Sequence, residues 1–358
     1  MSGLPQINIY FKQAAETAIK RSGQGIVALI LRDETASNVL AGSSASYGKL
    51  TEVTKSHFTD DNYDYITKTF LGSPQRIIVE RIGEDDSYGD ALARLKNKKW
   101  NYLSIPGIAD DDASVIAEWI AAQRENKKTF KAVLKYDDAN SPGIINFATE
   151  GISVAGKVYS SAEYCCRIAG LLAGLSFNDF ERASATYSKL PEVDSITEST
   201  TPDEDIKAGK LILINDGSAI KIGRAVNSLH QLSDAQTEDM KKIRIIEIMD
   251  LICDDIRTAF SDNYLGVYSN GYDNKLLFVN EATQYLRRLA DIDILEKEYD
   301  NKAFIDINAQ RKYLAERSDV SNMSDEDIKK AKTGSLVFVG SNVMPLDAME
   351  DLDMYISM

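Results

Sequence analysis

Paired carboxylates recur along the first half of the chain and have the spacing that most resembles a catalytic or metal-binding pattern. They stand roughly 25 residues apart, at Asp60-Asp61, Asp85-Asp86, Asp110-Asp111-Asp112 and Asp137-Asp138. That interval is the length of one strand plus one helix. Carboxylates at the carboxyl ends of parallel strands can bind magnesium, or a phosphorylated ligand through it. Aspartate is also a preferred helix N-cap, and Asp112 directly precedes a helical sequence, so we favour capping over a metal site.

Other catalytic patterns are weaker still. A serine nucleophile needs a positioned base, and the chain has only two histidines, His57 and His230. The glycines of segment 217–223 are separated by five residues and lack the Gly-Lys-Ser/Thr ending of a phosphate-binding loop. The vicinal Cys165 and Cys166 lie in an apolar helical sequence, where cysteines are commonly packing residues. We therefore expect no enzymatic activity, no metal and no cofactor.

Composition narrows the class of partner. The chain has 358 residues, 44% of them hydrophobic and 27% charged, which is typical of folded domains. A formal net charge of −14 disfavours binding to nucleic acid or to anionic membranes. The three cysteines form no disulfide framework, and neither a signal peptide nor an apolar run of about 20 residues is present. These features predict a cytoplasmic protein with protein partners, without direct nucleic-acid contact or membrane insertion.

The elements that position these residues alternate between strands and helices over the first half. A continuous apolar run at residues 25–32 is typical of a strand buried on both faces. Further strands are expected at 76–81, 100–105, 131–135 and 144–148, and helices at 63–70, 89–97, 113–126 and 162–172. Such alternation predicts a mostly parallel sheet with right-handed crossovers. The polar region 178–209 is predicted to be a linker or hairpin between domains.

The last third has a different pattern. A hairpin is expected at 210–222, around Asp216-Gly217, followed by a core helix at 237–260 and a second helix at 274–291. Ser324 and Asp327 match a capping box at the start of a short charged helix. A last pair of strands is expected to begin at residues 335–339. This region is predicted to be α+β.

Both ends of the chain alternate apolar and polar residues, as strands do. Ile7, Ile9 and Phe11 share one face near the start, and Leu352, Met354 and Ile356 share one face near the end. A terminal strand of this length cannot bury its apolar face or satisfy its backbone groups alone. Each must therefore join a sheet of its own chain or of a neighbouring subunit, and the second case makes the protein an assembly subunit.

Several segments resemble a known family. The segments 220–229, 245–256 and 264–270, in this order, are similar to the C-terminal region of contractile phage tail sheath proteins. The opening residues 3–9 and the closing residues 348–356 resemble the small XkdK-like sheaths of Gram-positive prophages and of phage-tail-like (R-type) bacteriocins. The resemblance covers both termini and most of residues 210–358.

The resemblance implies an architecture. It implies an N-terminal arm (1–22), a mostly parallel α/β outer domain (23–206), an α+β inner sheath domain (207–344) and a C-terminal arm (345–358). The arms would add strands to sheets of neighbouring subunits. The exchanged residues would be Leu4, Ile7, Ile9 and Phe11 in the first arm, and Leu352, Met354 and Ile356 in the second.

The resemblance also implies a function and partners. Subunits would stack as six-fold rings around an inner tube and contract, driving the tube through a target cell envelope. Lys329, Lys330 and Lys332 would face the tube. Partners would be other copies of this chain, the inner tail tube protein, and the baseplate and tail terminator proteins. Assembly would take place in the bacterial host cytoplasm, and lysis would release the phage tail or tail-like particle.

Two alternatives remain open from the sequence. Both end strands could pair within their own subunit, which would leave a monomeric α/β enzyme or ligand-binding protein that uses the acidic loops. The chain could also belong to a non-contractile tail or tube. Such components are shorter and mostly β, whereas this chain alternates strands and helices, so we rank that reading lower.

Overall fold

The computed structural model describes residues 25–35, 43–175 and 183–357, and these residues divide into two compact units. The α/β unit runs to Glu247 and takes in the chain again from Ala348. The α+β unit comprises Ile248–Asp347. The sequence-based boundaries at residues 22, 206 and 344 stay predictions. The residues Leu4, Ile7, Ile9 and Phe11 lie outside the described residues.

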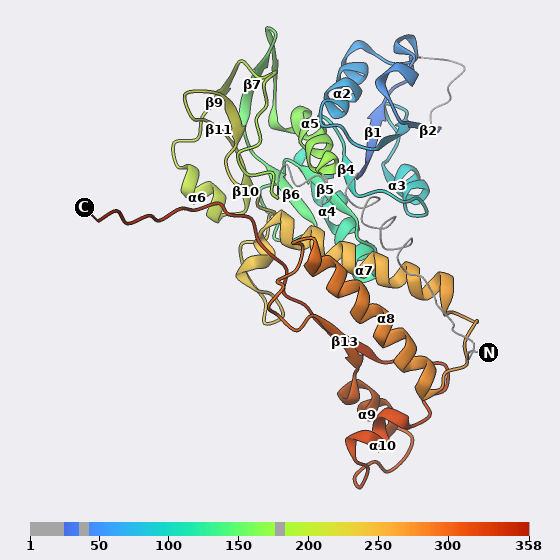
Figure 1. Ribbon diagram of the computed structural model, residues 1–358. Helices are drawn as coiled ribbons and strands as arrows, with labels where there is room; N and C mark the ends of the chain where they lie inside the picture. The colour runs from blue at the N-terminus through green and yellow to red at the C-terminus, as the bar shows by residue number, and fades with distance from the viewer. Residues whose placement is uncertain (1–24, 36–42, 176–182, 358) are drawn as a thin grey trace, which may run out of the picture. The chain divides into compact units, whose positions relative to one another are not determined.

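A seven-stranded sheet forms the centre of the α/β unit, in the order β10-β6-β5-β4-β1-β3-β2 (Figure 1). Its strands are β1 (Ile26–Arg32), β2 (Ser44–Tyr47), β3 (Arg76–Ile82), β4 (Tyr102–Ser104), β5 (Lys131–Leu134), β6 (Ile144–Phe147) and β10 (Lys210–Leu211). All neighbouring pairs are parallel except β2 with β3. The predicted mostly parallel sheet is confirmed.

The apolar run of β1 is explained by burial on both faces of the sheet. Val27, Leu29 and Leu31 belong to one core cluster, which includes side chains of α2 (Asp60–Phe70) and α5 (Ser161–Gly174). Ala28 and Ile30 belong to a second cluster, which includes α3 (Gly89–Leu95) and α4 (Asp110–Glu125). Alternate residues of one strand thus enter opposite layers, because successive side chains of a strand point to opposite faces. The sheet is covered by helices on both sides.

Smaller elements complete the α/β unit. A three-stranded sheet consists of β7 (Glu150–Val154), β8 (Lys157–Tyr159) and β9 (Ser195–Thr197), and the predicted hairpin is present as β11 (Leu213–Asn215) and β12 (Ile220–Ile222). The remaining elements are α6 (Pro202–Lys207) and the 3-10 turns Leu50–Glu52, Lys55–His57 and Glu238–Lys241. The described part of the region 178–209, expected as a linker or hairpin, therefore contains folded elements: β9 pairs with β7, and α6 follows it.

The α+β unit is built on two long helices. Its elements are α7 (Ile243–Asn263), which begins in the α/β unit, α8 (Tyr272–Asp291), β13 (Lys302–Ile305), α9 (Ile307–Ala315), α10 (Asp325–Lys330) and β14 (Val339–Asn342). Val279 and Ala282 of α8 pack on Ala303 and Ile305 of β13. β13 and β14 form an antiparallel pair. The last strand begins at Val339, later than expected, and pairs with β13, not with the C-terminal residues.

Glycines allow α2 and the end of α5 to approach closely. A Cβ built on Gly170 of α5 would lie 2.1 Å from the Thr69 carbonyl oxygen of α2. A Cβ on Gly174 would lie 1.7 Å from the carbonyl oxygen of Gly72, which follows α2. Both contacts are to backbone atoms, which cannot turn aside as a flexible side chain can. The helix pair therefore depends on residues without a side chain at these positions.

We expect Gly170→Ala to lower the free energy of unfolding of the α/β unit by about 1–3 kcal/mol, because the added methyl group forces the two backbones apart. Gly89→Ala is the matched control, since the nearest atom to its added Cβ is the Ser87 hydroxyl oxygen at 3.5 Å. Both tryptophans, Trp100 and Trp119, lie in this unit, so urea unfolding followed by tryptophan fluorescence measures the effect. Equal midpoints for the two variants would contradict the packing argument.

Candidate functional site

Two of the four acidic groups, Asp60-Asp61 and Asp110-Asp111-Asp112, lie at helix starts, but as first-turn residues. Helix α4 begins at Asp110, and Ala109 occupies its N-cap position without a side-chain cap. Asp112 is therefore not an N-cap, and the prediction was wrong at this residue. Helix α2 is capped by Thr59, whose side chain accepts from the Asn62 amide, and Asp60 follows in the first turn. These carboxylates stabilise the positive end of each helix dipole instead.

The other pairs are held by local contacts. Asp86 accepts a hydrogen bond from the Gly83 amide at 2.8 Å. Asp137 pairs with Lys135 at 2.5 Å and accepts from Asn146 at 3.2 Å. Within residues 25–35, 43–175 and 183–357, no group of three or more histidine, cysteine, aspartate or glutamate side chains is arranged to hold a metal ion. The acidic loops thus serve local structure where the chain is described.

One buried carboxylate was missed from the sequence because it stands alone after a strand. Asp33 follows β1 and is fully buried, 2.9 Å from Arg81 of β3. Burial raises the pKa of Asp33, but hydrogen bonds from Thr35, Asn62 and Thr59 lower it, and the net pKa lies below the usual value. The carboxylate joins β1, β3 and the start of α2, so we assign it a structural role.

The nucleophile candidates are also structural. Cys165 and Cys166 are buried, and burial raises the pKa of both thiols, that of Cys166 to about 12. Both therefore stay protonated near neutral pH and act as packing residues, as the sequence indicated. The His230 ring nitrogen Nδ1 lies 3.0 Å from the Ser228 carbonyl oxygen, a local contact within its own turn. These contacts form no arrangement of nucleophile and base.

The C-terminal arm, which we define as residues 347–357, has neither helix nor strand (Figure 1). Leu352, Met354 and Ile356 are 86%, 64% and 70% exposed. The residues predicted to share an apolar strand face are thus in solvent in the single subunit. The alternative in which this end pairs within its own chain receives no support from the described residues.

An apolar groove lies along the β13–β14 pair and has a volume of about 420 Å³. Its lining comes from α7, α8 and both strands, namely Ile252, Cys253, Ile256, Arg257, Phe260, Phe278, Ala282, Ala303, Val337, Val339, Gly340 and Ser341. β13 and β14 pair only with each other among the described strands, so each has an edge without a strand partner. On the outer edge of β13, the Ala303 amide donates to Thr283 Oγ1 of α8 at 3.1 Å.

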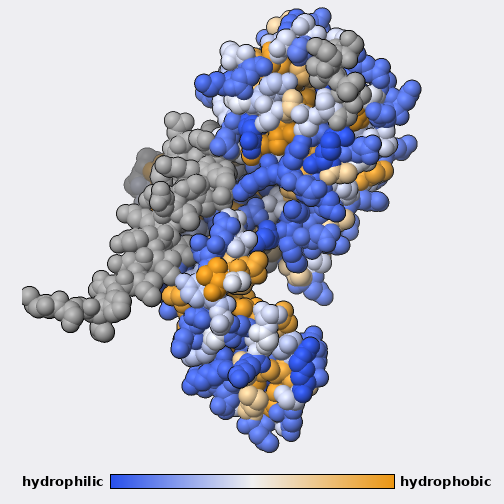
Figure 2. All heavy atoms as spheres, turned by 90° about the vertical axis from the view of Figure 1, so that its right-hand side faces the viewer, coloured by the Kyte–Doolittle hydropathy of each residue, from blue (hydrophilic) through white to orange (hydrophobic). Residues whose placement is uncertain are grey.

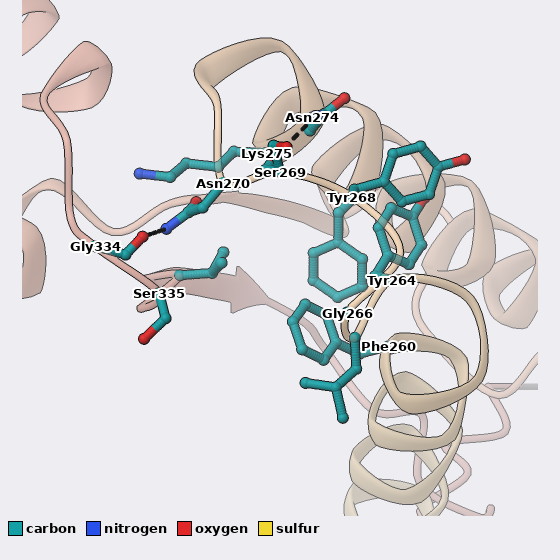
Figure 3. A pocket seen from close by; sticks show the side chains of 13 residues that line it. Phe260, Tyr264, Gly266, Tyr268, Ser269, Asn270, Asn274, Lys275, Gly334 and Ser335 are labelled. Atoms are coloured by element: carbon teal, nitrogen blue, oxygen red, sulfur yellow. Dashed lines mark hydrogen bonds between the residues drawn. The ribbon is translucent and has the colours of Figure 1, made fainter.

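A neighbouring pocket of about 470 Å³ shares Phe260, Phe278 and Val337 with this groove (Figure 3). The ring of Tyr264 lies 5.0 Å from that of Phe278 and 6.2 Å from that of Phe260, measured between centroids. Leu265 and Val267 in the following loop are exposed. Figure 2 shows that the face of the molecule seen there is mostly hydrophilic and is interrupted by separate apolar patches.

The predicted tube-facing lysines lie on and after α10. The capping box is confirmed: the Asp327 amide donates to Ser324 Oγ at 3.2 Å, and the Ser324 amide donates to Asp327 Oδ2 at 3.1 Å. Lys329 pairs with Glu326 at 2.7 Å, and Lys330 and Lys332 are exposed. The structure therefore leaves Lys330 and Lys332 as the cations most open to a partner.

A buried polar cluster holds α10 in place. Lys275 of α8 is buried and donates to Thr333 Oγ1 at 2.9 Å, and Gln310 of α9 donates to the Ile328 carbonyl oxygen. Burial lowers the pKa of Lys275. No local sequence pattern indicates this cluster, because its members lie on three separate segments.

The strand edges of β13 and β14 and the exposed apolar residues of the C-terminal arm favour a protein that assembles with other chains. Comparison with family models identifies the family. The phage tail sheath protein central domain matches residues 83–228, and the phage tail sheath C-terminal domain matches residues 235–358. The chain is 34% identical to the tail sheath protein of Clostridium phage phiCD119 over the full length of both. The chain belongs to the phage tail sheath family and is a structural sheath subunit.

Solved structures share the fold at low sequence identity. The sheath tail protein of Listeria innocua is 15% identical, with a TM-score of 0.72 over 95% of this chain and 96% of its own. The helical sheath of the anti-feeding prophage in its contracted state is 13% identical, with a TM-score of 0.68 over 100% and 99%. The enzyme alternative therefore has no support from relatives. No helix in the described part of the chain is long and apolar enough to cross a membrane.

We expect Asp33→Asn to lower the free energy of unfolding of the α/β unit by about 3–5 kcal/mol at pH 7, because Arg81 is left buried without its counter-charge. Since the folded-state pKa of Asp33 is lowered, its contribution is present above about pH 4 and is lost as pH falls through the folded-state value. Asp60→Asn is the control, because the Lys55–Asp60 pair is exposed. Urea unfolding from pH 7 to pH 3 measures both, and a loss for Asp33→Asn no larger than the control's would refute the assignment.

Proposed function

We propose that this chain polymerises as stacked six-fold rings around an inner tube and contracts to drive the tube through a target cell envelope. The C-terminal arm carries the proposal, because it presents an apolar strand face that its own subunit leaves in solvent. Membership of the tail sheath family and the similarity to a contracted helical sheath support it.

The arm has the chemistry of a donated strand. Burying a side chain such as Leu, Met or Ile contributes about 1.5–3 kcal/mol, so three exposed ones are a large unused driving force. The intervening residues Asp353, Tyr355 and Ser357 are exposed as well, which keeps both faces of the arm available. A neighbour that offers strand edges and an apolar groove would gain both backbone hydrogen bonds and burial.

We assign the acceptor to the β13–β14 pair of a neighbouring subunit. A two-stranded sheet is marginal by itself, and added strands stabilise it. In this arrangement Leu352, Met354 and Ile356 enter the groove beside Val339. The N-terminal residues Leu4, Ile7, Ile9 and Phe11 are proposed to add a second donated strand. Since each subunit gives its arms and receives those of others, the contacts do not close on themselves and a helical lattice results.

Contraction follows from rigid units joined by arms. If the α/β and α+β folds stay intact while the donated strands stay paired, the remaining contacts between subunits can be exchanged in concert. No bond needs to be made or broken for this work, so the proposed function requires no catalytic residue.

The inner surface is assigned to α10 and the lysines around it. Lys329, Lys330 and Lys332 are proposed to contact the inner tail tube protein through exposed charges. Such contacts are weak and screened by salt, which suits a surface that must release the tube during contraction.

Further partners are proposed from the same family pattern. They are the baseplate and the tail terminator proteins, which bound the sheath at its ends. Assembly is proposed to take place in the bacterial host cytoplasm, with release of the phage tail or bacteriocin particle by lysis.

We expect removal of residues 347–358 to abolish polymerisation and to leave the subunit folded, because the arm has no core of its own. Electron microscopy measures the polymers, and circular dichroism measures the fold. The triple variant Leu352→Ser, Met354→Ser, Ile356→Ser should behave like the truncation, whereas the control Asp353→Ser, Ser357→Ala should polymerise. Normal polymers from the truncated chain, or its unfolding, would refute strand donation by this arm.

Reversing the charge of Lys329, Lys330 and Lys332 to Glu should weaken assembly on the tube while empty sheath polymers still form. Each exposed pair contributes only up to about 1 kcal/mol, but the polymer repeats the contact at every subunit. The control changes three exposed lysines of the α/β unit, Lys96, Lys127 and Lys128, to Glu. Co-assembly with the tube protein is imaged at low and high salt; normal tails from the first variant at both would place the tube contact elsewhere.

A further inference from the structure

At the start of the C-terminal arm, a charged side chain is buried while its apolar neighbour is exposed, which is the reverse of the usual arrangement. The side chain of Glu350 is only 7% exposed, whereas the neighbouring Met349 is fully exposed and Asp351 is 78% exposed in its side chain. Transfer of a carboxylate from water costs free energy unless a cation compensates, and exposure of Met costs the burial that it would otherwise gain. A specific contact must therefore hold Glu350 inward.

Arg224 supplies that contact. Its Nε forms an ion pair with Glu350 Oε2 at 3.7 Å, an atom that is buried and accepts no hydrogen bond from the described residues, and its Nη2 donates to Asp351 Oδ1 at 2.5 Å. One guanidinium thus lies between two successive carboxylates of the arm. The planar group can serve both, because its nitrogens point in different directions.

The backbone around Arg224 is fixed by the core of the α/β unit. Gly223 donates to the Ile212 carbonyl oxygen at 2.9 Å, and the Ala225 amide donates to Thr186 Oγ1 at 2.9 Å. Ile222, at the end of β12, is completely buried. Arg224 therefore extends from a rigid strand end, which makes it a suitable anchor for a segment without secondary structure.

The first residues of the arm form one wall of a hollow in the α/β unit. A cavity of about 450 Å³ is lined by Ala183, Ser184, Thr186 and Tyr187 together with Ala348, Met349 and Glu350. Thr186, which binds the backbone next to Arg224, also lines this cavity. The same short segment thus supports both the arginine and the residues that it holds.

We propose that Arg224 is a positioning residue for strand donation: its ion pairs with Glu350 and Asp351 anchor the start of the C-terminal arm on its own subunit, so that residues 352–357 project toward an acceptor. The proposal rests on the proposed function. An anchored arm searches fewer conformations, so less entropy is lost when it pairs. Anchoring by charge also leaves the apolar side chains of the arm for the neighbouring subunit.

The direct test is Arg224→Ala, with the concentration needed for polymerisation measured by sedimentation of the full chain. We expect that concentration to rise several-fold. The subunit should keep its unfolding midpoint, because Arg224 is at the surface of the unit. Arg76→Ala is the matched control, since Arg76 is an exposed arginine at the start of β3 in the same unit. An unchanged concentration for Arg224→Ala, or an equal rise for the control, overturns the proposal.

A double-mutant cycle tests the pairing itself. Glu350→Gln with Asp351→Asn should raise the polymerisation concentration as Arg224→Ala does, and combining all three changes should add little more. Fully additive effects would show that Arg224 and the carboxylates act independently, which overturns the proposal. The difference between wild type and Arg224→Ala should also shrink at high salt, because the contact is partly exposed.

Proteolysis of the monomer tests the anchor independently of polymerisation, and so applies even if a variant is less stable. Chymotrypsin cleavage within the arm, at Leu352 or Tyr355, should be faster in Glu350→Gln, Asp351→Asn than in the wild-type monomer if the anchor holds the arm; equal rates overturn the proposal. The truncation of residues 347–358 distinguishes failure of strand donation from failure of the Arg224 anchor. If it still polymerises, strand donation itself fails, whereas if it fails to polymerise and Arg224→Ala assembles normally, only the anchor fails.

Discussion

The exposed apolar face of the C-terminal arm is the constraint on which the assembly depends. Leu352, Met354 and Ile356 are exposed, so their apolar surface contributes no burial free energy in the single subunit. The described part of the subunit also provides no strand partner for this segment. β13 and β14 have an apolar groove beside them, but among the described strands neither has a strand partner on its outer edge. In the proposed assembly, the arm of one copy and the strand edges of a second copy supply what the other lacks.

Such an assembly works only if the linked bodies are rigid. In the α/β unit, backbone contacts at Gly170 and Gly174 and the buried Asp33–Arg81 pair remove freedom between helices and strands. In the α+β unit, Lys275 and Gln310 connect α8, α9 and the segment after α10. Under the proposed function, a rotation of whole subunits is then transmitted through the donated strands without being absorbed inside the fold.

Charge has a different task from apolar burial in this chain. Some ion pairs, such as Lys302–Asp300, are exposed on both sides and contribute little each, so they can form and separate as neighbours move. Arg224 pairs with the nearly buried Glu350 directly before the exposed residues 351–357. In the proposed assembly, apolar side chains therefore form the lasting contacts between subunits. Charged side chains position the arm or form contacts that can be broken.

The sequence alone determined the sheet, the long helices and the alternation at the chain ends, because periodicity reports which faces are apolar. The run at β1 and the capping box at Ser324 were both confirmed, since each depends on neighbours within a few residues. Local pattern also misled: Asp112 fits a cap by type, yet α4 begins at Asp110, and the position of a helix start depends on packing against the sheet. The tertiary structure alone decided which residues meet across long separations, namely Asp33 with Arg81, Lys275 with Thr333, and Arg224 with Glu350. No pattern along the chain encodes these pairs, because their members come from different elements and are brought together only when the apolar faces are buried.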